Sequence, residues 1–240
     1  MTDAPDGPAR PQSGSRNLIA RIAVALILIP LAIGAAWAGS WVWAVLVVPV
    51  AIGLFIEWLL IVKAAPSSSR SGWIALGVLY AAAALIGSLL VRHDIEYGFV
   101  ALLLVFAVVW ASDIGGYFAG KSIGGPKLAP RISPNKTWAG ALGGFGLSLL
   151  VAVGFSLAGQ GRLLPLLALA AMLSVVSQLG DLFESAIKRH FGVKDSSHII
   201  PGHGGLLDRL DGFVAAIALA ALVGFLRGGA DGVGRGLMVW

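Results

Sequence analysis

The chain has 240 residues, of which 58% are hydrophobic and only 12% are charged, about half the usual charged share of a soluble domain. With a mean hydropathy of +0.88 and no cysteine, this composition excludes a disordered chain, a collagen-like repeat, a disulfide scaffold and a Cys-based zinc site. The net charge of +5 comes without a dense basic run, so we expect a membrane protein and no nucleic-acid partner.

About seven apolar stretches are candidates to cross the roughly 30 Å of hydrocarbon as helices, although the last of them is short. In chain order they run over 18–36, 41–62, 73–91, 98–118, 139–158, 163–180 and 212–226, and the sixth can continue beyond the membrane surface. The sequence therefore predicts an all-α, polytopic integral membrane protein with about seven, and up to nine, transmembrane helices. A cleaved signal peptide is an alternative for the first stretch, because Ala36-Trp37-Ala38 fits a small-residue cleavage pattern.

The two ends of the chain are expected to lie outside the membrane-embedded part. Residues 1–17 are rich in Pro, Gly and Ser and predict a disordered N-terminal tail, and 227–240 predict a C-terminal tail. Thirteen of the 17 Lys and Arg residues fall in the N-terminal segment and in every second connection between the predicted helices. The positive-inside rule assigns these connections, including 119–138 and 181–211, to the cytoplasm.

Asp113 lies inside the otherwise apolar stretch 98–118. An ionisable residue within a membrane span is costly and indicates function by default. The alternative is an interfacial carboxylate that is hydrogen-bonded to a neighbouring helix.

The segment 178–189 predicts a helix that carries polar residues on one face. Asp181, Glu184, Ser185 and Lys188 have the spacing i, i+3, i+4 and i+7, so they share that face. The alternative is a solvated helix end, with Glu184 and Lys188 as an ordinary i,i+4 pair.

The segment 201–211 combines a glycine-rich turn with two carboxylates. Gly204 and Gly205 follow His203, and their backbone N–H groups can form an anion-binding nest. Asp208 and Asp211 are three residues apart, so on a helical turn they face one way and suit Mg²⁺ beside phosphate oxygens. A histidine such as His203, taken alone, more often has a structural role.

The loop 120–138 contains lysines, glycines and hydroxyl residues, which suit phosphate binding, although the order of a P-loop is missing. Attraction to anionic lipid head groups is an alternative that is compatible with the first. Gly140 and Gly144 then open the next span with GxxxG spacing, which indicates either close packing within the chain or a dimer seam.

The stretch from Ser185 to Asp211 resembles the signature of phosphatidate cytidylyltransferases, also called CDP-diacylglycerol synthases. The segments around Asp113, Ser133-Pro-Asn-Lys-Thr137 and Gly180-Asp181 also resemble parts of that family. The matching signature positions are Ser185, Lys188, Arg189, Lys194, Asp195, His203, Gly204, Gly205, Asp208, Arg209 and Asp211.

The resemblance implies a Mg²⁺-dependent nucleotidyltransferase of phospholipid biosynthesis that converts CTP and phosphatidic acid into CDP-diacylglycerol and pyrophosphate. It implies Asp208 and Asp181 as first-choice metal ligands, with Asp211 and Asp113 as second choices, and it leaves room for a second cation. The residues it implies in catalysis are Asp208, Asp181, Lys136, Lys188, Arg189 and His203. Those it implies in substrate binding are Ser133, Asn135, Lys136, Thr137, Ser185, Lys188, Arg189, Lys194, Gly204, Gly205 and Arg209.

The same resemblance implies a membrane-embedded cytidylyltransferase domain over 18–226, with catalytic loops 110–138 and 178–212. It implies a polar cavity that faces the cytoplasm, a homodimer, contact with membrane lipid, and a location in a bacterial inner membrane. The alternatives are a CTP-dependent polyprenol or lipid kinase, a CDP-alcohol phosphotransferase, and a non-enzymatic lipid or ion transporter.

Overall fold

The computed structural model describes residues 14–194, 196–197 and 205–240, with side chains described from residue 26 onward. Within these residues the chain is almost entirely helical. The elements are α1 (Gly14–Ala38), α2 (Ser40–Val62), α3 (Ser67–His93), α4 (Gly98–Ser122), β1 (Lys127–Ala129), β2 (Ser133–Thr137), α5 (Trp138–Leu157), α6 (Leu163–His190), α7 (Leu207–Gly228) and α8 (Val233–Met238).

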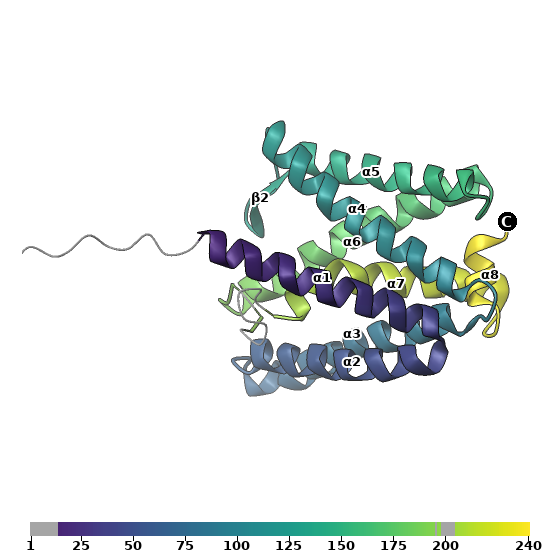
Figure 1. Cartoon of the computed structure of the whole chain (residues 1–240). Helices are drawn as coiled ribbons and strands as arrows, with labels where there is room; N and C mark the ends of the chain where they lie inside the picture. The colour runs from purple at the N-terminus through teal and green to yellow at the C-terminus, as the bar shows by residue number, and fades with distance from the viewer. Residues whose placement is uncertain (1–13, 195, 198–204) are drawn as a thin grey trace, which may run out of the picture.

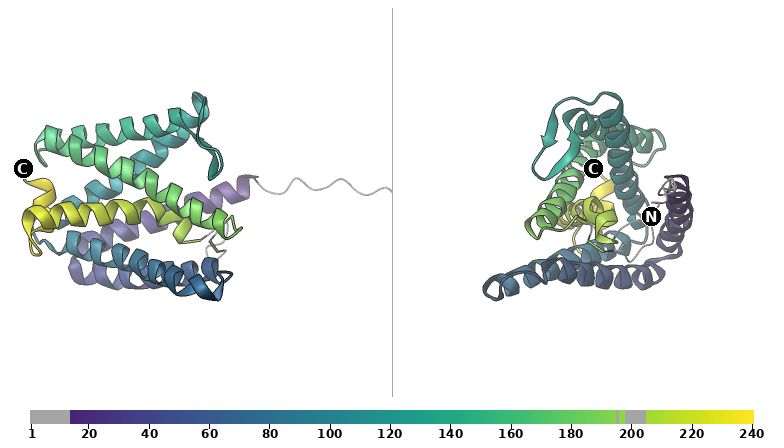
Figure 2. Two further views of the ribbon diagram at one scale, coloured as in Figure 1. Left: turned by 180° about the vertical axis from the view of Figure 1, so that it is seen from behind. Right: turned by 90° about the vertical axis from the view of Figure 1, so that its left-hand side faces the viewer.

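The long helices run along the molecule from one end to the other (Figure 1). The strand β2, the start of α1 and the end of α6 lie at one end, and the C-terminus and α8 lie at the opposite end. Figure 2 shows from two further sides that α2 lies beside α3 and that α4 lies beside α5. The helices α6 and α7 pack against each other, α6 contacts α4 and α5, and α7 contacts α3, α4 and α2.

Each of the seven predicted spans coincides with one of the helices α1 to α7. Six helices of the described chain, α2 to α7, are long and apolar enough to cross a membrane, and Leu26–Ala38 of α1 forms a shorter apolar stretch. Large apolar side chains such as Leu79, Leu142 and Leu150 remain exposed on outer helix faces, as expected of surfaces that meet lipid. The predicted all-α, polytopic membrane fold is therefore confirmed.

Two segments differ from the expectation, and a third follows it. The loop 119–138 contains a short antiparallel hairpin, in which Ala129 O accepts a hydrogen bond from Ile132 N across a turn that begins with Pro130. The sixth span continues as helix to His190, as the sequence allowed. The predicted tail 227–240 contains α8, where Val233, Leu237 and Met238 are buried.

The contact between α4 and α5 is made largely by glycines. A Cβ atom added to Gly144 would clash with the carbonyl oxygen of Ser112, and one added to Gly140 would lie 2.8 Å from the carbonyl oxygen of Gly116. Ser148 Oγ donates to Val108 O across the same seam at 3.1 Å. The GxxxG pattern at Gly140 and Gly144 therefore serves packing within the chain, which removes the alternative of a dimer seam at these two residues.

Candidate active site

A cavity of about 590 Å³ opens beside the hairpin, between α4, α5 and α6. Its volume lies within the range of pockets that bind small ligands. Its polar lining comes from segments far apart in the sequence, which the packing of α4 on α5 brings together. The lining residues are Ser112, Asp113, Gly116, Tyr117, Gly120, Lys121, Leu128, Asn135, Lys136, Thr137, Gly140, Ala141, Gln178 and Asp181.

The cavity holds a charged pair between the hairpin and α6. Lys136 Nζ forms an ion pair with Asp181 Oδ2, and both side chains are about 30% exposed, at 27% and 32%. Asp113 of α4 lines the same cavity and is close enough for the charge of Asp181 to act on it. The resemblance assigned all three residues to the site, and the fold brings them to one cavity.

Hydrogen bonds hold the inner wall of this cavity in place. Ser112 Oγ and Ser174 Oγ are 3.1 Å apart, which joins α4 to α6. The side-chain amide of Gln178 donates to Ser112 Oγ and to Ala141 O, both at 3.3 Å. Three helices are thus fixed around the position of Asp113.

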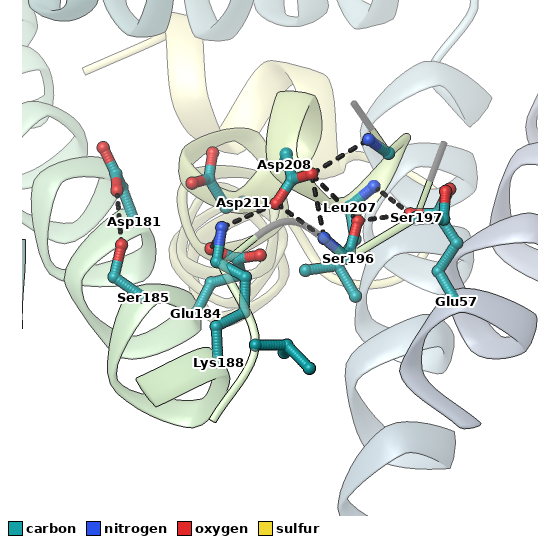
Figure 3. A network of polar contacts seen from close by, with 12 residues as sticks. Glu57, Asp181, Glu184, Ser185, Lys188, Ser196, Ser197, Leu207, Asp208 and Asp211 are labelled. Carbon is teal, nitrogen blue, oxygen red and sulfur yellow. Dashed lines mark hydrogen bonds and ion pairs between the residues drawn. The ribbon is translucent and has the colours of Figure 1, made fainter. Parts of the chain in front are cut away.

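A second polar group lies between α6 and the start of α7 (Figure 3). Lys188 Nζ lies 2.7 Å from Glu184 Oε2 and 2.6 Å from Asp208 Oδ1. Glu184 is only 1% exposed and Lys188 9% exposed. The interpretation of this segment as a solvated helix end is therefore wrong, because the i,i+4 pair is buried and shared with a third residue.

Asp208 accepts hydrogen bonds at both of its carboxylate oxygens. Oδ2 accepts from Gly205 N at 2.9 Å and from Ser196 Oγ at 3.1 Å. Ser196 N also donates to Oδ2, at 3.1 Å. Because Lys188 occupies Oδ1, Asp208 would have to exchange one of these partners to ligate a metal ion.

Asp181 connects the cavity to this second group. Its Oδ1 accepts a hydrogen bond from Ser185 Oγ at 3.4 Å, while its Oδ2 faces Lys136 in the cavity. The charges of Asp181, Glu184 and Asp113 also reach Asp211, whose Oδ1 accepts from Gly212 N at 2.8 Å. The predicted helix face is confirmed, since Ser185 Oγ donates to Asp181 Oδ1 and Lys188 Nζ pairs with Glu184 Oε2 along α6 (Figure 3).

The carboxylates outnumber the cations among the described side chains here. Asp113, Asp181, Glu184, Asp208 and Asp211 stand against Lys136 and Lys188. In the described part of the chain no three acidic or histidine side chains form a ready-made metal cage. The donor set instead fits Mg²⁺, which binds one or two carboxylates and takes its other ligands from water and substrate phosphates.

Glu57 is a site residue that sequence reasoning missed. It is 0% exposed, lies in α2, and accepts hydrogen bonds from Ser196 Oγ at 2.9 Å and from Leu207 N at 2.8 Å. Its signal in the sequence was an acidic residue within an apolar span, the same signal that singled out Asp113.

Several expected site residues have other partners or lie elsewhere. Thr137 Oγ1 caps α5 by accepting from Gly140 N at 3.1 Å, and Arg189 Nε donates to Ile132 O at 3.3 Å, which joins α6 to the hairpin. Gly205 is buried, and Lys194 is exposed beyond the end of α6. His203, Gly204 and Asp195 lie outside the described residues.

At this end of the helical bundle, Lys136 of the hairpin lies beside the group of carboxylates described above. Lys136 lines the cavity together with Lys121 and Asn135, whose side chains also carry N–H donors, and this suits a ligand with phosphate groups. The carboxylates suit a divalent cation that such a ligand brings with it. The cavity and the carboxylates beside it therefore have the chemical groups that suit a phosphate-bearing ligand together with a divalent cation.

Comparisons with known proteins agree with this chemistry. The model of the cytidylyltransferase family matches residues 67–226, which include the cavity and most of the polar group around Lys188. A phosphatidate cytidylyltransferase of Brucella suis is 48% identical over 176 residues, which cover 72% of this chain and 64% of that protein. One from Bacillus subtilis is 42% identical over 166 residues, covering 68% of this chain and 62% of that protein. The chain thus spans slightly less than two thirds of the length of the curated relatives it matches.

Proposed function

Because the chain belongs to the cytidylyltransferase family, we propose that it transfers a cytidylyl group from CTP to phosphatidic acid, forming CDP-diacylglycerol and pyrophosphate. The observation that carries this proposal is the cavity beside Lys136 and Asp181 at the end of membrane-spanning helices. A nucleotide can enter such a cavity from water while a lipid phosphate approaches from the head-group layer. Both substrates would then meet at one site.

The proposed reaction exchanges one phosphorus–oxygen bond for another. A phosphate oxygen of the lipid attacks the α-phosphorus of CTP, and the bond from that phosphorus to the bridging oxygen of the β-phosphate breaks. Pyrophosphate leaves with the electron pair of that bond. An ionised lipid phosphate needs no general base, so the protein contributes mainly position and charge neutralisation.

Two lysines in different parts of the site can neutralise the phosphate charges. Lys136 lies at the cavity wall, where its ammonium group can turn from Asp181 to a nucleotide phosphate. Lys188 lies between Glu184 and Asp208, and can shift toward the leaving pyrophosphate without losing both partners. Each lysine would thus stabilise negative charge that develops on phosphate oxygens.

Mg²⁺ is the cofactor that this donor set supports. Asp181, Asp113 and Asp211 are the carboxylates whose charges act on one another, and Asp208 joins them if Lys188 moves to a phosphate. When bound, the ion would neutralise charge on the nucleotide phosphates and hold them in line for attack.

The distribution of basic residues supports a location in a bacterial inner membrane with the cavity on the cytoplasmic side. The cavity opens at the end of the bundle where the hairpin lies, and this end carries the connections rich in Lys and Arg (Figure 1). We also expect a homodimer, whose seam must use residues other than Gly140 and Gly144 because these already pack against α4.

One assay tests the proposal. The full chain, purified in detergent, is incubated with α-labelled CTP, phosphatidic acid and Mg²⁺, and label is measured in the lipid extract. We expect a CDP-lipid product that requires both Mg²⁺ and phosphatidic acid. A product only with a polyprenol and γ-labelled CTP would indicate a lipid kinase. No product with any lipid, together with lipid or ion flux in vesicles, would indicate a transporter.

A further inference from the structure

Glu57 is a fully buried carboxylate at the end of α2. Each of its oxygens accepts two hydrogen bonds. Oε1 accepts from Ser197 Oγ at 2.6 Å and from Leu206 N at 2.9 Å. Oε2 accepts from Ser196 Oγ at 2.9 Å and from Leu207 N at 2.8 Å. The carboxylate is therefore satisfied by four donors.

These donors come from both sides of residues 198–204. Ser196 and Ser197 precede that segment, and Leu206 and Leu207 follow it at the start of α7. One side chain of α2 thus fixes the spacing between two pairs of donors that are nine or more positions apart in the sequence. The first N–H groups of α7 have no partner within their helix, so an anion at this position also satisfies the helix terminus.

The same two stretches carry the hydrogen bonds of Asp208. Ser196 Oγ lies 2.9 Å from Glu57 Oε2 and 3.1 Å from Asp208 Oδ2, so the two carboxylates share one hydroxyl group (Figure 3). Gly205 N donates to Asp208, and a Cβ atom added to Gly205 would lie only 2.5 Å from Glu57 Oε2. A change at Glu57 must therefore be transmitted to Asp208 and, through it, to Lys188.

We propose that Glu57 is a positioning residue for the cytidylyl transfer proposed above, on which this inference rests. Its carboxylate holds Ser196 and the start of α7 in the arrangement that orients Asp208 toward Lys188. Glu57 does not line the cavity, and its oxygens are bonded to Ser196 and to the start of α7, so it acts through these neighbours.

If Glu57 had only a packing role, an apolar residue could replace it. A buried charge is costly, and a well-packed apolar residue of similar shape is often equally stable or more so. If Glu57 only filled space in α2, Glu57→Met would keep both fold and activity. If it positions the site, the same variant must lose activity while the bundle stays intact.

Glu57→Gln gives a finer test. The serine hydroxyls can turn to accept from an amide, but the N–H groups of Leu206 and Leu207 cannot. Whichever way the amide lies, its NH₂ group faces one of these backbone donors. We expect Glu57→Gln and Glu57→Met to lower kcat by about tenfold or more, while KM for CTP changes less than about threefold.

Asp94→Asn is the matched control. Asp94 is also a buried carboxylate, and it accepts from the backbone N–H groups of Tyr97 at 2.9 Å and Arg235 at 2.7 Å at the opposite end of the bundle. This variant loses a comparable set of bonds far from the site. We expect its kcat, per correctly folded and CTP-binding molecule, to equal that of the unmodified chain.

Hydrogen exchange of the detergent-solubilised chain measures directly whether Glu57 holds Ser196 and the start of α7 in place. In Glu57→Gln, the amides of Ser196 and Leu207 should exchange about tenfold faster, while those of α4 and α5 stay unchanged. Normal kcat in both Glu57 variants, or lost activity with unchanged exchange at 196–207, would overturn the inference. If the unmodified chain makes no CDP-lipid, the proposed function fails instead, and the exchange measurement alone decides whether Glu57 anchors this segment.

Discussion

Lys188 and Asp208 join α6 to α7 through a contact of 2.6 Å between Nζ and Oδ1. Glu184 Oε2 lies 2.7 Å from the same ammonium group, so one cation pairs with the buried carboxylate of Glu184 and with the partly buried carboxylate of Asp208. Removing one partner of a buried pair leaves an uncompensated charge and costs about 3–5 kcal/mol. This group is therefore sensitive to changes that a surface pair would tolerate.

Asp208→Asn is expected to lower turnover by about 100-fold, which is the scale of losing one charged group from a preorganised site. The amide keeps one oxygen for Ser196 N and Gly205 N, but its NH₂ group cannot accept from Lys188. Because Glu184 still pairs with Lys188, the fold should survive with a lower melting temperature. Radiolabelled CTP and a thermal melt in detergent measure the two effects.

Asp231→Asn provides the control for Asp208→Asn, because Asp231 is exposed near the opposite end of the bundle. It should leave both turnover and melting temperature unchanged. Turnover in Asp208→Asn within about threefold of the unmodified chain would remove Asp208 from the catalytic group.

Lys136→Gln should raise KM for CTP by about tenfold with little change in melting temperature. Its ion pair with Asp181 is about 30% exposed on both sides, and exposed pairs contribute only about 0–1 kcal/mol to stability. A phosphate bound in the cavity would lose a full positive charge. The control is Lys127→Gln, because Lys127 is an exposed lysine of the same hairpin that does not line the cavity. Equal KM values for CTP in the two variants would contradict the assignment of Lys136 to phosphate binding.

Spacing along a single helix was sufficient to predict part of the site. Asp181, Ser185 and Lys188 share a face because residues three and four apart lie on the same side of a helix, and the hydrogen bond from Ser185 to Asp181 confirms it. The apolar stretches likewise predicted the helices α2 to α7, because their length and composition follow directly from the thickness of the membrane.

Contacts between distant segments could not be predicted in this way. Glu57 lies 139 positions before Ser196, and the residues around Glu57 do not indicate that Ser196 is its partner. The hairpin was missed because strands of three and five residues are too short to show an alternating pattern. The role of Gly205 depends on how closely Ser196 and Glu57 approach it, which follows from the packing of α2 against the start of α7.

Gly205→Ala should lower turnover strongly, because the added methyl group would overlap Ser196 Oγ and press on Glu57. Adding Ser196→Ala removes the overlapping oxygen, so the double variant should be more active than the sum of the two single losses predicts. Gly146→Ala, where the added methyl group meets nothing within 4 Å, should behave like the unmodified chain. If the changes in log kcat of the two single variants simply add up in the double variant, the two positions are not coupled.

Gly144→Val tests the seam between α4 and α5 that shapes the cavity. The larger side chain would meet the backbone of Ser112, so the helices must separate, and overpacking of this kind typically costs about 1–3 kcal/mol. A lower melting temperature and weaker CTP binding should follow together, since Ser112 lines the cavity. Gly154→Val faces open space in the same helix and should change neither quantity, while tolerance of Gly144→Val would contradict the close packing.

The absence of cysteine makes the orientation of the bundle directly measurable, because a single introduced thiol has no background. Ser122 lies at the end of α4 next to the cavity, and Gln160 lies in the exposed connection between α5 and α6 at the opposite end of the bundle, so Ser122→Cys and Gln160→Cys place one thiol at each end. If basic residues face the cytoplasm, a membrane-impermeant maleimide should label Gln160→Cys in intact spheroplasts and Ser122→Cys only in inverted vesicles. The reverse pattern would place the cavity outside the cytoplasm, where no CTP is available, and would contradict the proposed reaction as well as the orientation.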